Sequence, residues 1–74
     1  MRRMDCEMRA RTAEELRKLG NTSWEISKIV GCSETLVRYW LNEEGVPSHF
    51  YLKKLYELGC DILYIIVGVR QHGK

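Results

Sequence analysis

Apolar residues along this 74-residue chain recur three or four positions apart, in short blocks separated by turn-forming residues. The pattern predicts five helical segments, at about residues 6–19, 23–30, 34–42, 49–58 and 62–67. The β-branched residues of the last segment also permit an extended strand there. We therefore expect residues 1–74 to form a single all-α domain, a compact bundle of about five short helices.

The boundaries between these segments share one arrangement, in which a glycine, a spacer and a helix-capping residue follow one another. It occurs at Gly20-Asn21-Thr22, Gly31-Cys32-Ser33 and Gly59-Cys60-Asp61, with Gly45-Val46-Pro47-Ser48 as a longer version. Glycine ends helices in the left-handed conformation, and Thr, Ser and Asp side chains accept from the first free N–H groups of the next helix. Glu25 completes a capping box with Thr22.

The first segment has two candidate starting points. A cap at Asp5 would align Met8, Thr12, Leu16 and Leu19 along one stripe, whereas a cap at Thr12 would give a shorter helix, residues 13–19. Residues 1–5, which include Arg2 and Arg3, are expected to form a flexible basic arm or a frayed terminus.

The helical spacing also predicts which side chains face inward. The expected inward residues are Trp24 (in part), Ile26, Ile29, Val30, Val37, Trp40, Leu41, Phe50 or Tyr51, Leu52, Leu55 and Leu58. Ser27 is small, and we expect it where the second and third helices cross most closely.

The composition excludes some classes of function but does not identify one. The net charge is +2, from 12 basic and 10 acidic residues, so nucleic-acid binding would depend on a local gathering of positive charge. The three cysteines are odd in number and lack a CxxC pair or a suitably spaced histidine, which indicates reduced thiols in the cytoplasm and no metal site. No phosphate-binding loop, HExxH or Cys–His pair is present, and we expect neither an enzyme nor a cofactor or small-molecule ligand.

The sequence predicts neither a secretory signal nor a membrane span. No apolar core follows the basic start at residues 1–3, and the longest apolar run, residues 62–67, is too short to cross a bilayer. We expect no association with a membrane.

Residues 22–41, TSWEISKIVGCSETLVRYWL, resemble the helix-turn-helix of DNA-binding regulators. The resemblance is carried by a capping Thr22, the aliphatic and small pair Ile26 and Ser27, Gly31, and a capping Ser33. Residues 52–68, LKKLYELGCDILYIIVG, resemble the fourth and fifth helices of the Cro/CI repressor-like (XRE) group. Residues 12–22 fit that group less well and look more like compact tri-helical units of transposases and small phage regulators.

The resemblance implies that the helix at 34–42 enters the major groove of DNA. With Val37, Trp40 and Leu41 inward, its opposite side carries the candidate base-reading residues Glu34, Thr35, Arg38 and Tyr39. Arg38 suits guanine O6 and N7, Glu34 cytosine N4, and the Thr35 methyl a thymine methyl. Alternatively, Arg38 pairs only with Glu34, Glu34 merely complements the helix dipole, and Tyr39 lies flat on the surface.

Phosphates are expected at the amino end of the helix at 23–30, where free N–H groups attract anions. The candidate phosphate contacts are Asn21, Thr22, Ser23, Lys28, Ser33, Asn42 and Lys53. The loop Asn42-Glu43-Glu44-Gly45 is acidic where members of the group carry Lys or Arg, so Asn42, Ser48, His49 or Lys53 would have to replace that contact.

The last segment is apolar on all sides and therefore predicts a homodimer through Tyr64, Ile65, Val67 and Val69. Together these features predict a small dimeric transcriptional regulator, repressor-like, that binds an inverted-repeat operator on double-stranded DNA. Two alternatives are a protein-interaction module and the DNA-targeting subunit of a transposase or packaging complex.

Overall fold

The computed structural model describes the backbone of residues 2–69 and the side chains of residues 7–69. It contains five helices: α1 (Arg2–Leu16), α2 (Ser23–Val30), α3 (Glu34–Leu41), α4 (His49–Glu57) and α5 (Ile62–Val67). No strand occurs within residues 2–69, so the expected all-α bundle of about five short helices is confirmed. The last segment is a helix, and the extended alternative for it is wrong.

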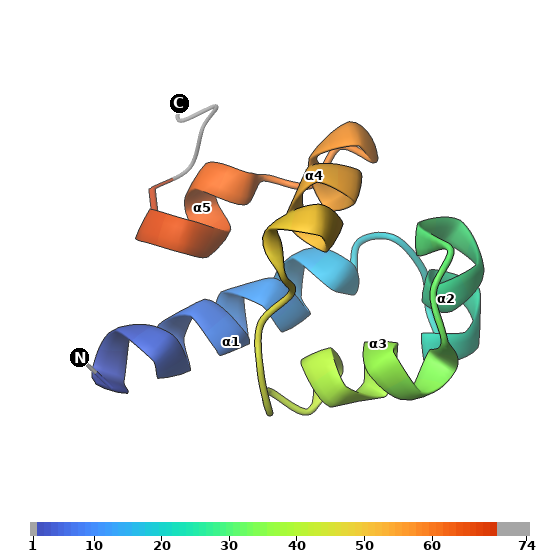
Figure 1. The fold of residues 1–74 in the computed structure, drawn as a ribbon, viewed down its shortest axis with the longest axis horizontal. Helices are drawn as coiled ribbons and strands as arrows, with labels where there is room; N and C mark the ends of the chain where they lie inside the picture. Colours follow the sequence, from blue (N-terminus) through green and yellow to red (C-terminus); the bar gives the residue numbers. More distant parts are fainter. Residues whose placement is uncertain (1, 70–74) are drawn as a thin grey trace.

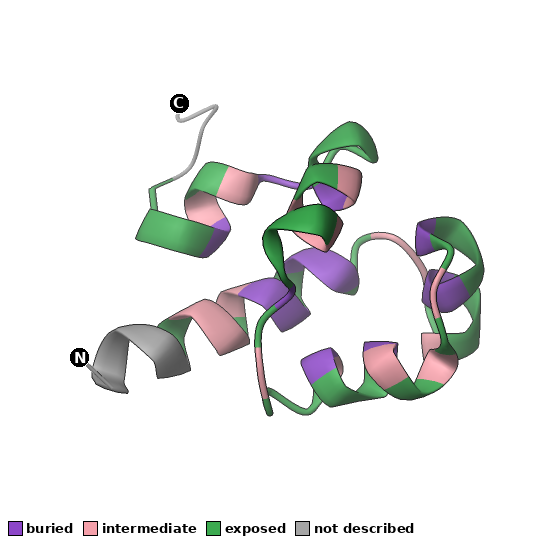
Figure 2. Ribbon diagram, viewed as in Figure 1, coloured by how far each residue is buried: buried purple, intermediate pink, exposed green. Residues whose placement is uncertain are grey.

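The helices are arranged around α1, which crosses the middle of the molecule (Figure 1). One side of α1 packs against α3, which in turn packs against α2, and the other side packs against α5, next to α4. The core lies where these helices meet, and the buried positions turn toward it (Figure 2). Its fully buried side chains include Leu16, Ile26, Val30, Val37, Trp40 and Leu55.

The first helix differs from both predicted versions. It begins at Arg2, so Asp5 lies inside the helix, and Thr12 is no cap because its hydroxyl donates to the Met8 carbonyl one turn earlier, at 2.8 Å. The predicted stripe nevertheless faces inward, with Thr12 and Leu16 fully buried. Residues 2–5 belong to the helix instead of a loose arm, and residue 1 lies outside the described residues.

The ends of α1 and α3 do not use the expected glycines. The helix α1 ends at Leu16, four residues before Gly20, and Gly20 has no left-handed backbone. After α3 the left-handed residue is Glu43, with φ of 61°. Gly45 serves another purpose, because a Cβ there would lie only 2.5 Å from the Tyr39 ring.

Several residues expected inside lie at the surface. Trp24 and Ile29 are exposed, since α2 buries only the narrow side formed by Ile26, Ser27 and Val30. Leu58, at the end of α4, is also exposed. Ser27 is buried. In α4 the inward aromatic is Tyr51, which meets Trp40 edge-to-face at a ring-centroid distance of 5.3 Å, and Phe50 is exposed.

Candidate nucleic-acid interface

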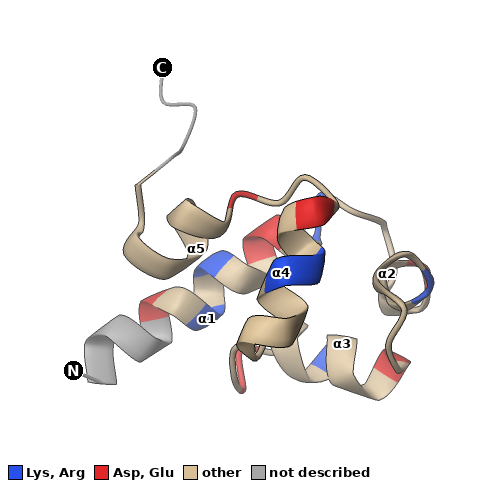
Figure 3. Ribbon diagram, turned by 45° about the horizontal axis from the view of Figure 1, so that its top comes forward, with Lys and Arg blue, Asp and Glu red and all other residues tan. Residues whose placement is uncertain are grey.

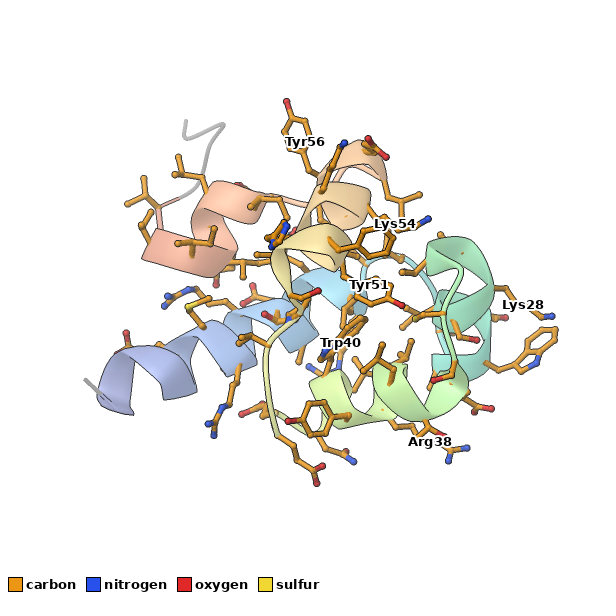
Figure 4. All side chains as sticks on the ribbon, viewed as in Figure 1. Lys28, Arg38, Trp40, Tyr51, Lys54 and Tyr56 are labelled. Atoms are coloured by element: carbon orange, nitrogen blue, oxygen red, sulfur yellow. The ribbon has the colours of Figure 1, made fainter. Side chains whose placement is uncertain are left out.

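The helix α3 is fixed from its inner side. Ser33 caps it by accepting from the Leu36 N–H at 3.1 Å, and Val37 and Trp40 are completely buried. The Trp40 ring meets Tyr51 of α4, as Figure 4 shows. Burial of a tryptophan at this junction restrains both the rotation and the tilt of α3.

The preceding helix is fixed by local signals that the sequence displays. Thr22 accepts from the Glu25 N–H at 3.1 Å, as a capping box requires, but the Glu25 carboxylate accepts from the Asn21 N–H at 2.8 Å, one residue before the expected Thr22 N–H. Gly31 ends α2 with φ of 86°, as predicted, and residues 31–33 connect α2 to α3. The result is two eight-residue helices joined by a three-residue turn.

The side of α3 opposite Trp40 faces solvent. We name the exposed side chains Thr35, Arg38, Tyr39 and Asn42 the outer face of α3. Arg38 points away from the Trp40 side in Figure 4. The Tyr39 ring lies against Gly45, so one side of the ring is covered. This matches the alternative in which Tyr39 lies flat on the surface. The outer face therefore presents a hydroxyl, a guanidinium and an amide with the phenol at its edge.

A polar chain joins the beginnings of α2 and α3. The Ser23 hydroxyl donates to Glu34 Oε2 at 2.8 Å, and Arg38 Nη2 donates to the same oxygen at 2.9 Å. The hydrogen bond from Ser23 and the charge of Arg38 lower the pKa of the Glu34 carboxyl, which is therefore an anion at neutral pH. The predicted alternative, in which Arg38 pairs with Glu34, is thus present in the structure.

The candidate phosphate contacts fall into two groups. Asn21, Thr22, Ser23 and Ser33 lie together, because the Ser23–Glu34 hydrogen bond brings the amino ends of α2 and α3 side by side. The first-turn N–H groups of Ser23 and Trp24 have no acceptor within their own helix and can receive an anion. The Ser23 hydroxyl, however, already uses its single proton on Glu34.

The remaining three lie elsewhere. Lys28 extends over the exposed Trp24 ring, with Nζ 5.2 Å from its centroid (Figure 4). Asn42 caps the opposite end of α3. Lys53 follows Tyr51 by two positions, about 200° around α4, so it faces away from α3.

Charge around the paired helix starts is mixed. Figure 3 shows basic and acidic positions interspersed over the described ribbon, and Arg38 is the cation within α3. Glu25 and Glu34 both lie at helix starts, and Glu43 and Glu44 follow α3. Any anion bound here is held by helix N–H groups and Arg38 rather than by a broad basic surface.

Sequence reasoning missed Lys54. Its Nζ lies 3.8 Å from the position of a Cβ on Gly31, so it reaches the turn between α2 and α3. Burial raises the pKa of the neighbouring Cys32 thiol, and the charge of Lys54 partly opposes that rise. The signal was available, because Lys54 lies three positions after Tyr51 and shares its side of α4 once Tyr51 is recognised as inward.

A second exposed surface of the molecule, which is apolar, lies on and just after α5. Leu63, Ile66, Val67 and Val69 are exposed, and we name them the α5 apolar face. Sequence reasoning missed Leu63 and Ile66, which line up with Val67 at the spacing of one helix side. Two predicted interface residues make contacts within the chain: Ile65 is completely buried, and the Tyr64 hydroxyl donates to Glu14 at 2.6 Å.

The described residues show neither a metal cluster nor a membrane-spanning helix, and comparisons with known proteins found no match. Within the described residues, no three His, Cys, Asp or Glu side chains gather as a metal site would require, and no helix has the length and apolarity to traverse a bilayer. The chain matches no family model, no curated protein and no solved structure.

Proposed function

We propose that this chain is a sequence-specific double-stranded DNA-binding protein, a small repressor-like transcriptional regulator in which α2 and α3 act as a helix-turn-helix. The observation that carries the proposal is the contrast between the two sides of α3. Its inner side is fixed by the buried Trp40, and its outer face is exposed and polar. A rigid helix with a free polar side is what the major groove accommodates.

The paired amino ends of α2 and α3 supply a second element. Their free N–H groups form an anion site beside the outer face, which suits a phosphate next to the groove. Thr35 and Arg38 are the base-reading residues, and Asn21, Thr22 and Ser33 lie on the phosphate side. Glu34 belongs with Arg38 rather than with the phosphates, because a carboxylate repels them.

The α5 apolar face supports self-association. Exposed Leu63, Ile66 and Val67 would be covered by the same residues of a second copy around a two-fold axis. A two-fold dimer suits an inverted-repeat operator, in which each half-site receives one copy of α3 and the half-sites lie about 34 Å apart.

Binding to duplexes selected from a random pool tests the proposal, with affinity measured over a range of salt concentrations. We expect salt-dependent binding and an enriched motif. Arg38→Ala should lose about 1–3 kcal/mol of discrimination at one base pair while the fold stays intact. Lys53→Ala, which removes a cation facing away from α3, is the matched control and should keep the motif. No enriched motif would contradict the proposal.

A protein-interaction module is the second candidate, favoured by the same exposed α5 apolar face. In that case binding to a partner would be insensitive to salt, and Arg38→Ala would leave it unchanged. A DNA-targeting subunit of a transposase or packaging complex would behave as a DNA binder in these assays and differ by binding as part of a larger assembly.

A further inference from the structure

The ion pair on α3 is held in a defined arrangement. Glu34 Oε2 accepts from Arg38 Nη2 at 2.9 Å and from the Ser23 hydroxyl at 2.8 Å. A surface pair on one helix is ordinarily free to separate. Here a third residue, from the neighbouring helix α2, fixes the carboxylate. The exposed side of α3 thus carries an acceptor and a fork of donors next to each other.

This order of groups matches one base pair. In the major groove a G·C pair presents guanine N7 and O6, both acceptors, followed by the cytosine N4 donor. The O6 and N4 atoms are hydrogen-bonded to each other, at about 2.9 Å. Arg38 Nη2 and Glu34 Oε2 lie at the same separation, 2.9 Å. The guanidinium has N–H groups beyond those used on Glu34, and the second carboxylate oxygen, Oε1, is available to a further donor.

We propose that Glu34 and Arg38 together read a single G·C base pair, with Arg38 on guanine O6 and N7 and Glu34 Oε1 on the outward N4 hydrogen of the paired cytosine. This inference rests on the proposed DNA binding and names the base pair that α3 selects. Ser23 is a positioning residue, because it aims the carboxylate without touching the base.

The pair also rejects the alternative base pair. An A·T pair in the same orientation places the adenine N6 donor opposite the Arg38 fork and the thymine O4 acceptor opposite the carboxylate. Donor then faces donor and acceptor faces acceptor, and one of these groups is charged in each case. Specificity arises from this repulsion as well as from the attraction to G·C.

Selection from a random duplex pool by the wild-type protein and four variants tests the inference. The wild-type protein should enrich a G·C pair at one position, and Arg38→Ala and Glu34→Gln should each relax that same position, on the order of tenfold or more. Ser23→Ala should weaken the preference there, and Ser23→Thr should restore it. Circular dichroism of each variant checks that the fold is intact.

Modified bases test the same contact with the wild-type protein. Replacing the guanine by 7-deazaguanine removes N7, and N4-methylcytosine blocks the outward hydrogen of N4, so either should lower affinity on the order of tenfold. Inosine in place of guanine keeps O6 and N7 and changes only the minor groove, and it should bind like guanine. Glu34→Gln should respond less than wild type to N4-methylcytosine.

The outcomes separate this inference from the proposed function. Salt-dependent binding with an enriched motif, in which Arg38→Ala and Glu34→Gln relax two different positions, overturns the inference and leaves the DNA-binding function standing. Relaxation at one shared position that is not G·C does the same. Absence of any enriched motif or salt-dependent binding overturns both.

Discussion

The helices α3 and α5 begin in the same way, but the side chains they expose differ in polarity. Each follows a left-handed glycine and a cysteine, Gly31-Cys32 for α3 and Gly59-Cys60 for α5. Each is then capped by a side chain that accepts from an N–H three residues later, Ser33 from Leu36 and Asp61 from Tyr64. The local signals that start a helix are therefore the same in both.

The difference lies in the outward residues. The outer face of α3 is polar, whereas the α5 apolar face exposes aliphatic side chains. An exposed polar side is stable in water and can exchange water for another polar surface, but exposed aliphatic area gains free energy only by meeting another apolar surface. Helix starts therefore organise the fold, and the outward residues determine which partner each helix can meet.

The largest effect is expected where α3 is anchored. Trp40→Ala should lower the free energy of unfolding by about 3–5 kcal/mol, because it empties a completely buried site, and this is much of the stability of a small domain. Trp24→Ala is the matched control: that ring is 57% exposed, and its removal should change stability by about 0.5 kcal/mol or less. Urea denaturation measures both. Equal losses would contradict the assignment of Trp40 as the anchor.

The anchor and the helix starts illustrate what the sequence reveals. The caps at Thr22, Ser33 and Asp61 act on N–H groups within three residues, so a local pattern contains all the information. The outer face of α3 follows similarly from about 100° of rotation per residue once Trp40 is placed inward.

What the sequence could not supply depends on distant neighbours. The exposure of Trp24 and Ile29 reflects how little of α2 the other helices cover, which no spacing within α2 reveals. The hydrogen bond from Ser23 to Glu34 joins residues eleven positions apart on different helices, so it requires the crossing geometry. The end of α1 at Leu16 likewise lacks a glycine or proline to mark it.

The α5 apolar face can be tested by a charge placed in its middle. Val67→Asp should leave the fold intact, because Val67 is exposed, and should weaken self-association on the order of 100-fold. The reason is that each copy would bury an unpaired carboxylate at a two-fold interface. The same change at Val46, an exposed valine between α3 and α4, is the control and should leave the mass unchanged. Sedimentation equilibrium of the three proteins decides whether α5 is the contact.

The cysteines that precede α3 and α5 predict different contributions to the pH dependence of stability. Burial, assisted by Glu15, raises the pKa of the Cys60 thiol from 9.0 to about 11. An unfolded chain therefore loses this proton first, so stability is full below pH 9 and falls as the pH rises toward 11, by up to about 2 kcal/mol. Urea denaturation at pH 8, 9, 10 and 11 measures this loss.

The matched variants are Cys60→Ala, which should remove this part of the slope, and Cys32→Ala. Cys32 is only half-buried, and its thiol has a nearby cation, Lys54, that opposes the rise in its pKa. Cys32→Ala should therefore change the slope less. An equal change in both variants would mean that the two thiols are equally shielded from water, which would contradict the difference in burial between Cys32 and Cys60.

The smallest effect is expected at the cap of α3, where stability and the proposed binding can be separated. Ser33→Ala removes the oxygen that accepts from the Leu36 N–H and should lower the free energy of unfolding by about 1 kcal/mol. Ser33→Asp keeps an acceptor at that position and adds a charge that the helix dipole favours, so stability should return to the wild-type value. The same carboxylate would occupy the anion site proposed for a phosphate, and duplex affinity should therefore fall even though the fold is as stable as before. An aspartate variant with unchanged DNA affinity would show that phosphates do not approach the start of α3, and it would assign the anion site to the start of α2 alone.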